Sequence, residues 1–495
     1  MKFAELFSGL KLFKDEQIIA DLSEMTISGI ALDSRNIVEG SVFFALAGAK
    51  QHGLMHVGQA IKNGACVIVY DPSGDGKQLA TQVSKVPMLA VADLGLVLGE
   101  IAARFYGHPS RQMDVIGITG TNGKTSCSQF LSQMLDDCGV IGTLGWGEWG
   151  NLNKTLNTTP DALSVQQILA DLLMQKKVKV AMEVSSHGLE QGRVNGVNFK
   201  GAVFTNISRD HLDYHGTMTS YLDAKLALLK SPGLAFAVVN LDSDYSTEIL
   251  AAVPQSVPVW GVSSTSGKSP SGETVFADEI LHKAEGIEFS VHWRQQQRRI
   301  SVPLYGDFNL ENVLIVLTVM LAMGVEFSVA TEKLAQIKPV VGRMERFGGA
   351  NKPLVFVDYA HTPDALDKVL ASLHKHCGQN LWVVFGCGGN RDTGKRPLMA
   401  SAAERWADHV IVTDDNPRFE ESAAIIKDIM AGYRSDKVEI IPDRKKAIQQ
   451  AVINADHHDY IVIAGKGHED YQEINGIRLP FSDQQCVIEA LSMRD

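Results

Sequence analysis

Cysteine is scarce in this sequence, and the few cysteines are not spaced as a bridging or metal-binding framework requires. Six cysteines are spread over 495 residues, and no two of them form a CxxC pair. A small disulfide-stabilised domain or a structural zinc site uses closely patterned cysteines. The sequence therefore predicts neither a disulfide framework nor a structural zinc site. We expect free thiols in a reducing, cytoplasmic environment.

An excess of positive charge is also missing. The chain carries 46 Lys and Arg against 57 Asp and Glu, a formal net charge of −11. A general nucleic-acid binder or membrane-surface protein presents a basic face, so both classes are disfavoured. The hydrophobic content of 45% argues against a largely disordered chain. We expect small-molecule partners and no nucleic acid, and we expect the protein to be a monomer.

Long apolar runs are absent as well. The longest run, at residues 313–325, is too short to cross a bilayer and predicts a buried helix. The stretch MKFAELFSGLKLFKDEQ interrupts its apolar side chains with charges too often for a signal-peptide core. The sequence therefore predicts no membrane insertion.

The sequence does contain a repeated alternation of short β-branched runs and helix-length amphipathic segments. This alternation is typical of parallel βαβ units with helices on both faces of the sheet, so the predicted fold class is α/β. A length of 495 residues corresponds to about three domains. We place them at residues 1–92, 93–339 and 340–495. The candidate strands lie at 41–46, 67–70, 86–90, 115–118, 178–182, 202–204, 235–239, 354–357, 381–385, 410–412, 439–441 and 460–463.

The strongest chemical signal follows the candidate strand at 115–118. There the sequence reads Gly117-Ile-Thr-Gly-Thr-Asn-Gly-Lys-Thr-Ser126 and continues into a helical pattern. Glycines in such a loop let backbone N–H groups surround phosphates, Lys124 can reach the β- and γ-phosphates, and the Thr125 hydroxyl can ligate Mg²⁺. Ile118 stands where the common P-loop pattern has its first glycine. The loop predicts nucleotide binding, with a ligand-free turn as the alternative.

Carboxylate and histidine side chains follow the next two candidate strands. Glu183 comes directly after the strand at 178–182, where a P-loop enzyme holds Mg²⁺, although a solvated strand-end carboxylate is the alternative. The loop after 202–204 offers four metal-type side chains, whose irregular spacing favours a polar loop near Mg²⁺ over a zinc site. These are Asp210, His211, Asp213 and His215. From the residues alone, Lys225 in the helical pattern YLDAK is predicted to be a surface lysine.

Four polar segments each come directly after a candidate strand near the C-terminus. They are DYAHTPDAL, GCGGNRD, TDDNPR and GKGHED, at 358–366, 386–392, 413–418 and 465–470. Loops after the carboxyl ends of parallel strands converge on one crevice. Arg391 and Arg418 can bind carboxylates, whereas Asp415 and Glu469 can accept hydrogen bonds from ammonium groups. The combination predicts a site for an amino acid, with ordinary turn residues as the alternative.

Taken together, these segments resemble the Mur ligases. GTNGKTS, EVSSHGL, FTNISRDHLDYHG, YLDAK, GRME, DYAHTPDAL and DDNPR occur in the order found in that family, and the resemblance extends from residue 32 to residue 469. It implies a small N-terminal α/β domain that binds UDP and a central P-loop ATPase with a mainly parallel sheet. It also implies a C-terminal Rossmann-like domain that binds the amino acid.

The resemblance implies the reaction as well. ATP would phosphorylate the D-glutamyl γ-carboxylate of UDP-N-acetylmuramoyl-L-alanyl-D-glutamate, with Mg²⁺ bound. The amine of meso-diaminopimelate would then displace phosphate and form an amide. Such an ADP-forming ligase would act in cytoplasmic peptidoglycan precursor synthesis.

Residue by residue, the resemblance implies several groups of site residues. The catalytic residues would be Lys124, Glu183, His211 and Lys225. The contacts of ATP would be Gly120, Thr121, Asn122, Gly123, Lys124, Thr125, Ser126, Asn309, Arg343 and Asp358. Those of the UDP-sugar dipeptide would be Leu32, Ser34, Asn157, Thr158, Thr159, Ser185, Gln191 and Arg193. Those of diaminopimelate would be Arg391, Asp415, Asn416, Pro417, Arg418, Gly465 and Glu469.

The resemblance further implies a metal site. Its ligands would be Thr125, Glu183, His211 and Lys225, the last as a carbamate derived from CO₂. A carbamate would convert the lysine cation into an anion. The implied role of Lys225 therefore reverses the surface-lysine prediction made from the residues alone.

Arg418 separates the two closest alternatives, because diaminopimelate differs from lysine by one distal carboxylate. A guanidinium left without that carboxylate would penalise lysine by about 1–3 kcal/mol, so a lysine-adding Mur ligase is disfavoured. A folylpolyglutamate synthetase would share the architecture but has no place for the N-terminal LDSR segment. A non-catalytic P-loop regulator would bind ATP but leave the four polar loops unexplained. Asn390 stands where many Mur ligases carry Asp, in GCGGDRD.

Overall fold

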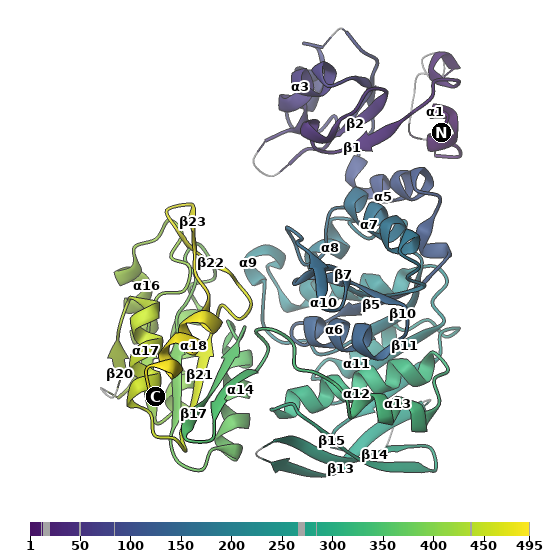
Figure 1. Cartoon of the computed structure of the whole chain (residues 1–495). Helices are drawn as coiled ribbons and strands as arrows, with labels where there is room; N and C mark the ends of the chain where they lie inside the picture. Colours follow the sequence, from purple (N-terminus) through teal and green to yellow (C-terminus); the bar gives the residue numbers. More distant parts are fainter. Residues whose placement is uncertain are drawn as a thin grey trace. The chain divides into compact units, whose positions relative to one another are not determined.

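The computed structural model describes residues 1–10, 12, 20–48, 51–83, 85–265, 273–283, 285–435 and 438–494. The chain forms two compact units. The first comprises Met1–Thr119, Asp136–Ala202 and Ala224–Ala235, and the second comprises Gly120–Leu135, Val203–Asp223 and Phe236–Asp495. Both units alternate helices and strands along the chain (Figure 1), which confirms the predicted α/β class.

The first unit begins with a small sheet of four parallel strands. In spatial order these are β1 (Gly29–Ala31), β2 (Ser41–Ala45), β3 (Ala65–Tyr70) and β4 (Met88–Ala90). Side chains alternate between the two faces of a strand, so Val42 and Phe44 pack on one side of β2 and Phe43 on the other. The first side is covered by α1 (Phe3–Phe7) and α5 (Leu94–Phe105), and the other by α3 (Val57–Lys62). A short helix α4 (Gly76–Ala80) precedes β4.

A second group of strands in the first unit surrounds β9 (Lys179–Glu183). It pairs in parallel with β5 (Asp114–Thr119) and with β6 (Cys138–Gly142). Two short antiparallel strands, β7 (Gly145–Glu148) and β8 (Asn151–Asn153), extend the group beyond β6. The helices here are α7 (Ala162–Met174) and α8 (Ser186–Glu190), and β10 (Phe199–Phe204) crosses the boundary between the two units.

The second unit contains the helix after the P-loop, α6 (Lys124–Met134), and a long buried helix, α12 (Asp307–Ala322). The apolar run at 313–325 thus forms most of a buried helix, as predicted. None of the described helices is long and apolar enough to cross a membrane. The nearby strands are β11 (Phe236–Asn240), β12 (Val259–Ser263) and β13 (Glu273–Lys283), which are parallel, followed by antiparallel β14 (Gly286–Trp293) and β15 (Gln296–Val302). Other helices here are α9 (Leu212–His215), α11 (Ser246–Ala252) and α13 (Phe327–Leu334), and α10 (Met218–Leu226) crosses the boundary between the two units.

The C-terminal part of the second unit is a three-layer α/β structure (Figure 1). Its sheet has the order β16 (Glu345–Gly349), β17 (Lys352–Asp358), β21 (Tyr460–Ala464), β18 (Leu381–Phe385), β19 (His409–Val412) and β20 (Val438–Ile440). All neighbours are parallel except β16 and β17. One face is covered by α14 (Pro363–His376), α15 (Lys395–Trp406) and α16 (Ser422–Met430), and the other by α17 (Arg444–Asn454) and α18 (Asp483–Ser492). A hairpin of β22 (Tyr471–Ile474) and β23 (Ile477–Pro480) follows β21.

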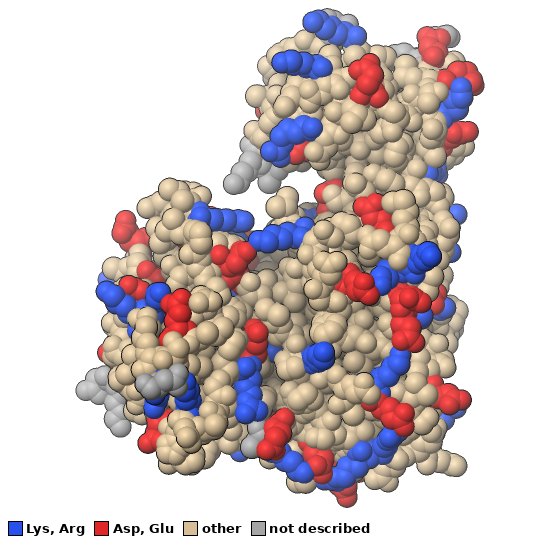
Figure 2. Space-filling model, in the orientation of Figure 1, with Lys and Arg blue, Asp and Glu red and all other residues tan. Residues whose placement is uncertain are grey.

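Charged side chains are mixed on the molecular surface. On the face drawn in Figure 2, Lys and Arg side chains alternate with Asp and Glu side chains, and many lie next to each other. Ion pairs in the described structure include Arg294 with Glu273 and Arg405 with Asp367. The presence of both signs of charge on this face agrees with the similar numbers of basic and acidic residues in the sequence, 46 and 57.

Candidate active site

The predicted phosphate loop joins β5 to α6, and its glycines fill positions that larger residues could not occupy. Gly120 has φ 147°, and a Cβ there would lie 1.9 Å from Thr205 Oγ1. Gly123 has φ 84° and precedes the first residue of α6. A Cβ on Gly123 would lie 2.5 Å from Asn312 Oδ1. Both glycines therefore allow a close backbone approach at the N-terminus of a helix, where free N–H groups favour anions.

Lys124 extends back over this loop. Its Nζ donates hydrogen bonds to the carbonyl oxygens of Gly120 and Thr121, each over 2.8 Å. The ammonium group therefore lies at the position a phosphate-binding lysine would need. Thr125 and Ser126, which follow it on α6, are buried.

The segment after β10 forms hydrogen bonds with the phosphate loop. The backbone N–H of Asn122 donates to Asn206 Oδ1 over 3.0 Å, and Thr205 Oγ1 donates to the Asn122 carbonyl over 2.6 Å. The Thr121 hydroxyl contacts the Tyr221 hydroxyl at 3.1 Å. Neither Thr205 nor Asn206 was singled out from the sequence. Their position directly after a candidate strand was the only available signal.

Residues distant in sequence meet the other side of the loop. Arg343 Nη2 donates to Thr125 Oγ1 over 3.1 Å, and its guanidinium carbon lies 4.4 Å from the centre of the Tyr359 ring. Asp358 is buried and accepts hydrogen bonds from the N–H groups of Met344 and Ala360, over 2.7 and 2.8 Å. Burial raises the pKa of the Asp358 carboxyl, and the charge of Arg343 only partly offsets this effect.

Asn309 is connected to the loop through a second asparagine. It is buried on α12, donates to the Tyr305 carbonyl over 2.8 Å and accepts from Asn312 Nδ2 over 3.2 Å. Asn312 is the residue that faces Gly123. The structure therefore brings together the P-loop, Asn309, Arg343 and Asp358, which the sequence resemblance assigned to one ligand.

Asp364 also lies at this place, although the sequence analysis did not single it out. Its Oδ2 accepts hydrogen bonds from Asn122 Nδ2 over 3.2 Å and from Ser208 Oγ over 3.0 Å. Asp364 is in the first turn of α14. It therefore joins the phosphate loop to the segment DYAHTPDAL.

Asp210 and His211 lie in the loop before α9. His211 has φ 54°, and its N–H donates to Asp210 Oδ1 over 2.9 Å. Burial raises the pKa of the Asp210 carboxyl, but the positive charges of His211, His361 and Lys395 outweigh it, so the net pKa lies below the usual value. Asp210 is therefore an anion in a positively charged setting.

Glu183 is completely buried, so the alternative of a solvated strand-end carboxylate is wrong. Its Oε1 accepts from the N–H of Thr143 over 2.9 Å, and its Oε2 accepts from the Thr143 hydroxyl over 3.0 Å. The same hydroxyl contacts Thr158 Oγ1 at 3.0 Å. A Cβ on Gly142 would lie 2.1 Å from Glu183 Oε1. Thr143 was missed because it belongs to a β-turn after β6 that carried no sequence signal.

Several residues assigned to the sugar dipeptide form one network in the first unit. Thr159 Oγ1 donates to the Glu183 carbonyl and accepts from the N–H of Ser185, each over 3.0 Å. Arg193 Nη1 donates to the Thr159 carbonyl over 2.8 Å, and Arg193 Nε donates to Gln191 Oε1 over 2.9 Å. Thr158, Thr159, Ser185, Gln191 and Arg193 are thus brought together, whereas Asn157 is exposed.

Leu32 and Ser34 lie directly after β1 in the first unit. Ser34 is buried, and its hydroxyl donates to Gln59 Oε1 over 2.9 Å. The Ser34 carbonyl accepts from Asn63 Nδ2 over 2.9 Å. Leu32 packs against the core of the N-terminal sheet. Both residues therefore lie at the carboxyl end of a parallel strand, where such sheets bind ligands.

Lys225 is buried, with 1% of its surface exposed, so the surface lysine predicted from the residues alone is wrong. Tyr221 and Leu222 of the same segment are buried as well. Among the described residues, no three His, Cys, Asp or Glu side chains gather in a group able to hold a metal ion. Asp213 and His215 lie on the short helix α9, which has no buried residue.

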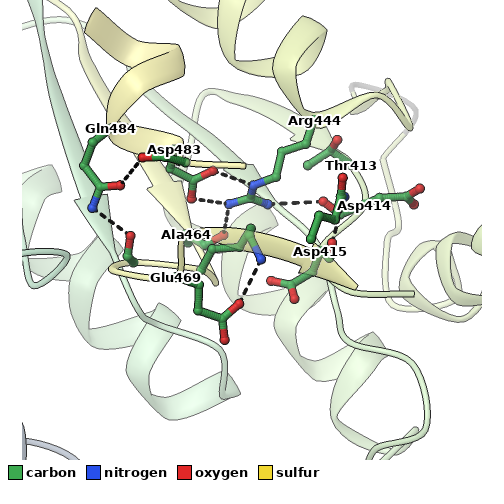
Figure 3. A network of polar contacts seen from close by, with 12 residues as sticks. Thr413, Asp414, Asp415, Arg444, Ala464, Glu469, Asp483 and Gln484 are labelled. Atoms are coloured by element: carbon green, nitrogen blue, oxygen red, sulfur yellow. Dashed lines mark hydrogen bonds and ion pairs between the residues drawn. The ribbon is translucent and has the colours of Figure 1, made fainter. Parts of the chain in front are cut away.

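In the C-terminal sheet, the loops after β19 and β21 contact each other directly (Figure 3). Asn416 is buried, and its Nδ2 donates to Glu469 Oε2 over 2.8 Å. The fully buried Lys466 donates from Nζ to the same oxygen over 2.8 Å and to Asn416 Oδ1 over 3.1 Å. Glu469 is therefore held by one cation and one amide, both on its Oε2 atom.

Asp415 is the neighbouring carboxylate. It is 8% exposed, and its carboxylate accepts no hydrogen bond from any part of the chain that the structure describes. Gly465 has φ 117°, and a Cβ there would lie 2.6 Å from Asp415 Oδ2. The Asp415 oxygens are not among the buried atoms without a partner, so the carboxylate is open to solvent and can accept hydrogen bonds from a positively charged ligand.

Arg418 links the loop after β19 to the loop after β18. It has φ 54°, its Nη1 donates to the Gly389 carbonyl over 2.8 Å, and its Nε lies 3.6 Å from Glu473 Oε2. Asn390 Oδ1 accepts from the N–H of Phe419 over 3.1 Å, which adds a second link. Pro417 is buried, whereas Arg391 is exposed. The loop at 358–366 joins them, because the rings of Tyr359 and His468 lie 5.2 Å apart, so all four predicted loops meet.

Three family models match successive parts of the chain. The model described as Mur ligase family, catalytic domain, matches residues 26–106. The Mur ligase middle domain matches residues 118–320, and the glutamate ligase domain of Mur ligases matches residues 342–467. The predicted succession of three domains is confirmed by these matches. The domain boundaries remain predictions.

Named proteins align with nearly the whole chain. The UDP-N-acetylmuramoyl-L-alanyl-D-glutamate–2,6-diaminopimelate ligase of Pseudomonas aeruginosa is 46% identical over 474 residues, which are 95% of this chain and 96% of that protein. The protein of the same name from Coxiella burnetii is 43% identical over 483 residues, 97% of this chain and 98% of its own. A solved structure of a protein with this name is 34% identical, has a TM-score of 0.69 and covers 100% of this chain and 99% of its own.

Proposed function

The chain belongs to the Mur ligase family, and we propose that it is an ATP-dependent, ADP-forming ligase that adds meso-diaminopimelate to the D-glutamyl γ-carboxylate of UDP-N-acetylmuramoyl-L-alanyl-D-glutamate. The observation that carries this proposal is the Asp415 carboxylate, to which no described group donates a hydrogen bond, in the same loop that bears Arg418. The carboxylates of Asp415 and Glu469 can bind ammonium groups, and the guanidinium of Arg418 can bind a carboxylate. Together they suit an amino acid with charged groups at both ends.

The reaction would proceed in two steps. The γ-carboxylate oxygen attacks the γ-phosphorus of ATP, the bond to the bridging oxygen breaks, and ADP leaves. The uncharged amine of diaminopimelate then attacks the acyl carbon, and a tetrahedral intermediate collapses to the amide with loss of phosphate and of one amine proton. Phosphate is a much better leaving group than oxide, so activation makes an otherwise uphill condensation feasible.

The phosphates of ATP would lie at the N-terminus of α6. Gly120 and Gly123 leave room there for a close backbone approach, and Lys124 Nζ would exchange its two loop carbonyls for phosphate oxygens. Asn309, Arg343 and Asp358 would form the nucleoside side of the site. Thr121, Asn122 and Ser126 would complete the contacts of the loop.

The proposal includes Mg²⁺, which when bound would neutralise negative charge on the β- and γ-phosphates. Its ligands would be the Thr125 hydroxyl, the buried Glu183 carboxylate and His211, together with a carbamate on Lys225. Carboxylate, hydroxyl and carbamate oxygens are the donors that Mg²⁺ prefers, so Thr125, Glu183 and the carbamate fit the ion, whereas the His211 imidazole is a nitrogen donor that suits other metals better. Burial of Lys225 supports the carbamate, because the modification would replace a buried cation with an anion able to bind the metal.

The UDP-sugar dipeptide would bind to the first unit. Leu32 and Ser34 would contact the uridine, at the carboxyl end of β1. The network of Thr159, Ser185 and Arg193 would hold the muramoyl dipeptide, with Asn157, Thr158 and Gln191 at its margin. Support comes from the direct links of Thr159 and Ser185 to the strand that ends in Glu183.

Diaminopimelate would lie across the loops of the C-terminal sheet. Asp415 and Glu469 would accept hydrogen bonds from ammonium groups, because no described group donates to the Asp415 carboxylate, and Lys466 and Asn416 both donate to the Oε2 atom of Glu469. Arg418 and Arg391 would bind carboxylates. The backbone of the two loops would be shaped by Asn416, Pro417 and Gly465.

The test is phosphate release from ATP with the UDP-muramoyl dipeptide and meso-diaminopimelate, lysine or no amino acid, with the product mass measured. We expect release and the added mass of one diaminopimelate only with that amino acid. Turnover with lysine would keep the ligase and reject the proposed pocket. ATP binding without amino-acid-dependent release would favour the regulator alternative instead.

Location, assembly and domain limits complete the proposal. All six cysteines are free thiols, which supports a cytoplasmic protein. We propose a monomer with domains at residues 1–92, 93–339 and 340–495. Sedimentation velocity would test the monomer, and limited proteolysis with mass analysis would test the domain boundaries.

A further inference from the structure

A buried ion pair lies beneath the two loops proposed to bind diaminopimelate. Arg444 begins α17 and Asp483 begins α18, and both side chains are 0% exposed. The pair is bidentate: Arg444 Nε donates to Asp483 Oδ1 over 2.7 Å, and Nη2 donates to Oδ2 over 2.8 Å (Figure 3). No step of the proposed reaction uses either residue.

The same guanidinium reaches two backbone carbonyls. Arg444 Nη2 donates to the Ala464 carbonyl over 2.9 Å, and Nη1 donates to the Asp414 carbonyl over 3.4 Å. Ala464 ends β21, and Asp414 follows β19. Because β18 separates β21 from β19 in the sheet, these two strand ends share no ladder hydrogen bonds. Arg444 provides a direct connection between them.

The residues that follow these two carbonyls face each other. Asp415 comes after Asp414, Gly465 comes after Ala464, and a Cβ on Gly465 would lie only 2.6 Å from Asp415 Oδ2. A small shift between the strand ends would therefore change the space around the Asp415 carboxylate.

We propose that Arg444, held in orientation by Asp483, is a positioning residue that sets the spacing between the Asp415 loop and the Gly465 loop for diaminopimelate. This inference rests on the proposed function. It concerns affinity for the amino acid, because Arg444 is buried below the loops and donates to the Asp483 carboxylate and to two backbone carbonyls of the loops.

The geometry explains why the residue is an arginine. A planar guanidinium offers five N–H donors in a fixed fork, and here they serve two carboxylate oxygens and two carbonyls at once. Lysine keeps the charge but offers one donor group, so it cannot reproduce the fork. The start of α17 does not depend on Arg444, because the Asp443 side chain caps it by accepting from the N–H of Lys446 over 3.1 Å.

The experiment uses the full-length enzyme and measures KM separately for meso-diaminopimelate and for ATP. We expect Arg444→Lys and Asp483→Asn each to raise KM for diaminopimelate about tenfold while KM for ATP changes less than about twofold. Asp459→Asn is the matched control. Asp459 is also buried and accepts from Trp382 Nε1 over 2.9 Å, but it lies at the opposite end of the sheet, directly before β21. This control should lower thermal stability and leave KM for diaminopimelate unchanged.

Three results would overturn the inference. The first is a lower melting temperature of Arg444→Lys and Asp483→Asn with an unchanged KM for diaminopimelate. The second is an equal rise of KM for both substrates. The third is failure of both variants to fold by circular dichroism, which would make the pair a folding requirement. Absence of diaminopimelate-dependent turnover in the unmodified enzyme would instead reject the proposed function, and the inference with it.

Discussion

Arg343 donates a hydrogen bond from Nη2 to the Oγ1 atom of Thr125 over 3.1 Å, although the two residues are 218 positions apart in the chain. Thr125 is the second residue of the helix that follows the phosphate loop. Arg343 lies at the start of the segment that matches the glutamate ligase domain. The contact therefore ties the beginning of that segment to the proposed nucleotide site.

We expect Arg343→Ala to weaken ATP binding by about tenfold or more, because a hydrogen bond from a charged donor contributes about 1.5–3 kcal/mol. Calorimetric titration with a non-hydrolysable ATP analogue measures this directly. Arg346→Ala is the control, since Arg346 donates from Nη1 to the Tyr305 hydroxyl over 2.6 Å instead. Equal losses in both variants would show that the Thr125 contact has no special role.

Gly120→Ala should abolish nucleotide binding. The added Cβ would lie 1.9 Å from Thr205 Oγ1 at a φ of 147°, so the loop or the Thr205 segment must move. Gly107→Ala is the matched control, because Gly107 also has a positive φ, of 73°, but has open space around its Cα. The control should cost about 1 kcal/mol of stability and keep ATP affinity. Retained ATP binding by Gly120→Ala would contradict the proposed phosphate site.

Arg418→Lys should reduce discrimination between diaminopimelate and lysine by about 1–3 kcal/mol, because an ammonium group cannot bind a carboxylate in the bidentate way of a guanidinium. The measurement is the ratio of kcat/KM for the two amino acids. Arg405→Lys serves as the control, since Arg405 is exposed and pairs with Asp367. An unchanged ratio in Arg418→Lys would remove Arg418 from the specificity pocket.

The helices, strands and motifs that could be predicted from the sequence are those that depend only on residues adjacent in the chain. The buried helix α12, which includes residues 313–322 of the apolar run, and the parallel strands of the C-terminal sheet follow from local apolar patterns, and they appear within a few residues of their predicted limits. The phosphate loop follows from one short motif. The antiparallel strands β7, β8, β14 and β15 were not predicted, and neither were the parallel strands β6, β12 and β13. Of these, β8 and β15 lack a continuous apolar run.

The contacts that complete the site depend on pairing between distant segments. Asn206 supports the phosphate loop across 84 positions, and Asp364 reaches it across 242. Thr143 holds Glu183 from a turn with no distinctive composition. Lys225 is likewise buried because other segments pack around its helix. The helical pattern of the sequence does not predict which segments these are. Only the family resemblance pointed to that residue.

Lys225→Ala should lose ligase activity and regain part of it with short-chain carboxylic acids, which would supply the missing anion in place of the carbamate. Phosphate release with and without added acetate or formate measures both effects. Lys230→Ala is the control, because Lys230 is exposed a few residues later. Normal turnover by Lys225→Ala would contradict the carbamate. Loss without rescue would leave a structural role for the buried lysine.

Stability should fall on mild acidification because of His376 on α14. Burial, followed by the charge of His282, lowers the pKa of His376 from 6.5 to about 4. The folded protein therefore keeps this ring neutral between pH 6.5 and about 4, while the unfolded chain takes up a proton. Since the unfolded state binds more protons there, the free energy of unfolding rises with pH, and its full value is present above pH 6.5.

His376→Gln should therefore flatten the dependence of the free energy of unfolding on pH between about 6.5 and 4, because glutamine does not titrate. Urea denaturation at a series of pH values across this window gives the slope. His374→Gln, on the same helix but exposed, should leave the slope as it is in the unmodified protein. The same slope in His376→Gln and the unmodified protein would show that protonation of other groups drives the acid sensitivity, because only a histidine kept neutral by folding couples its own proton uptake to unfolding.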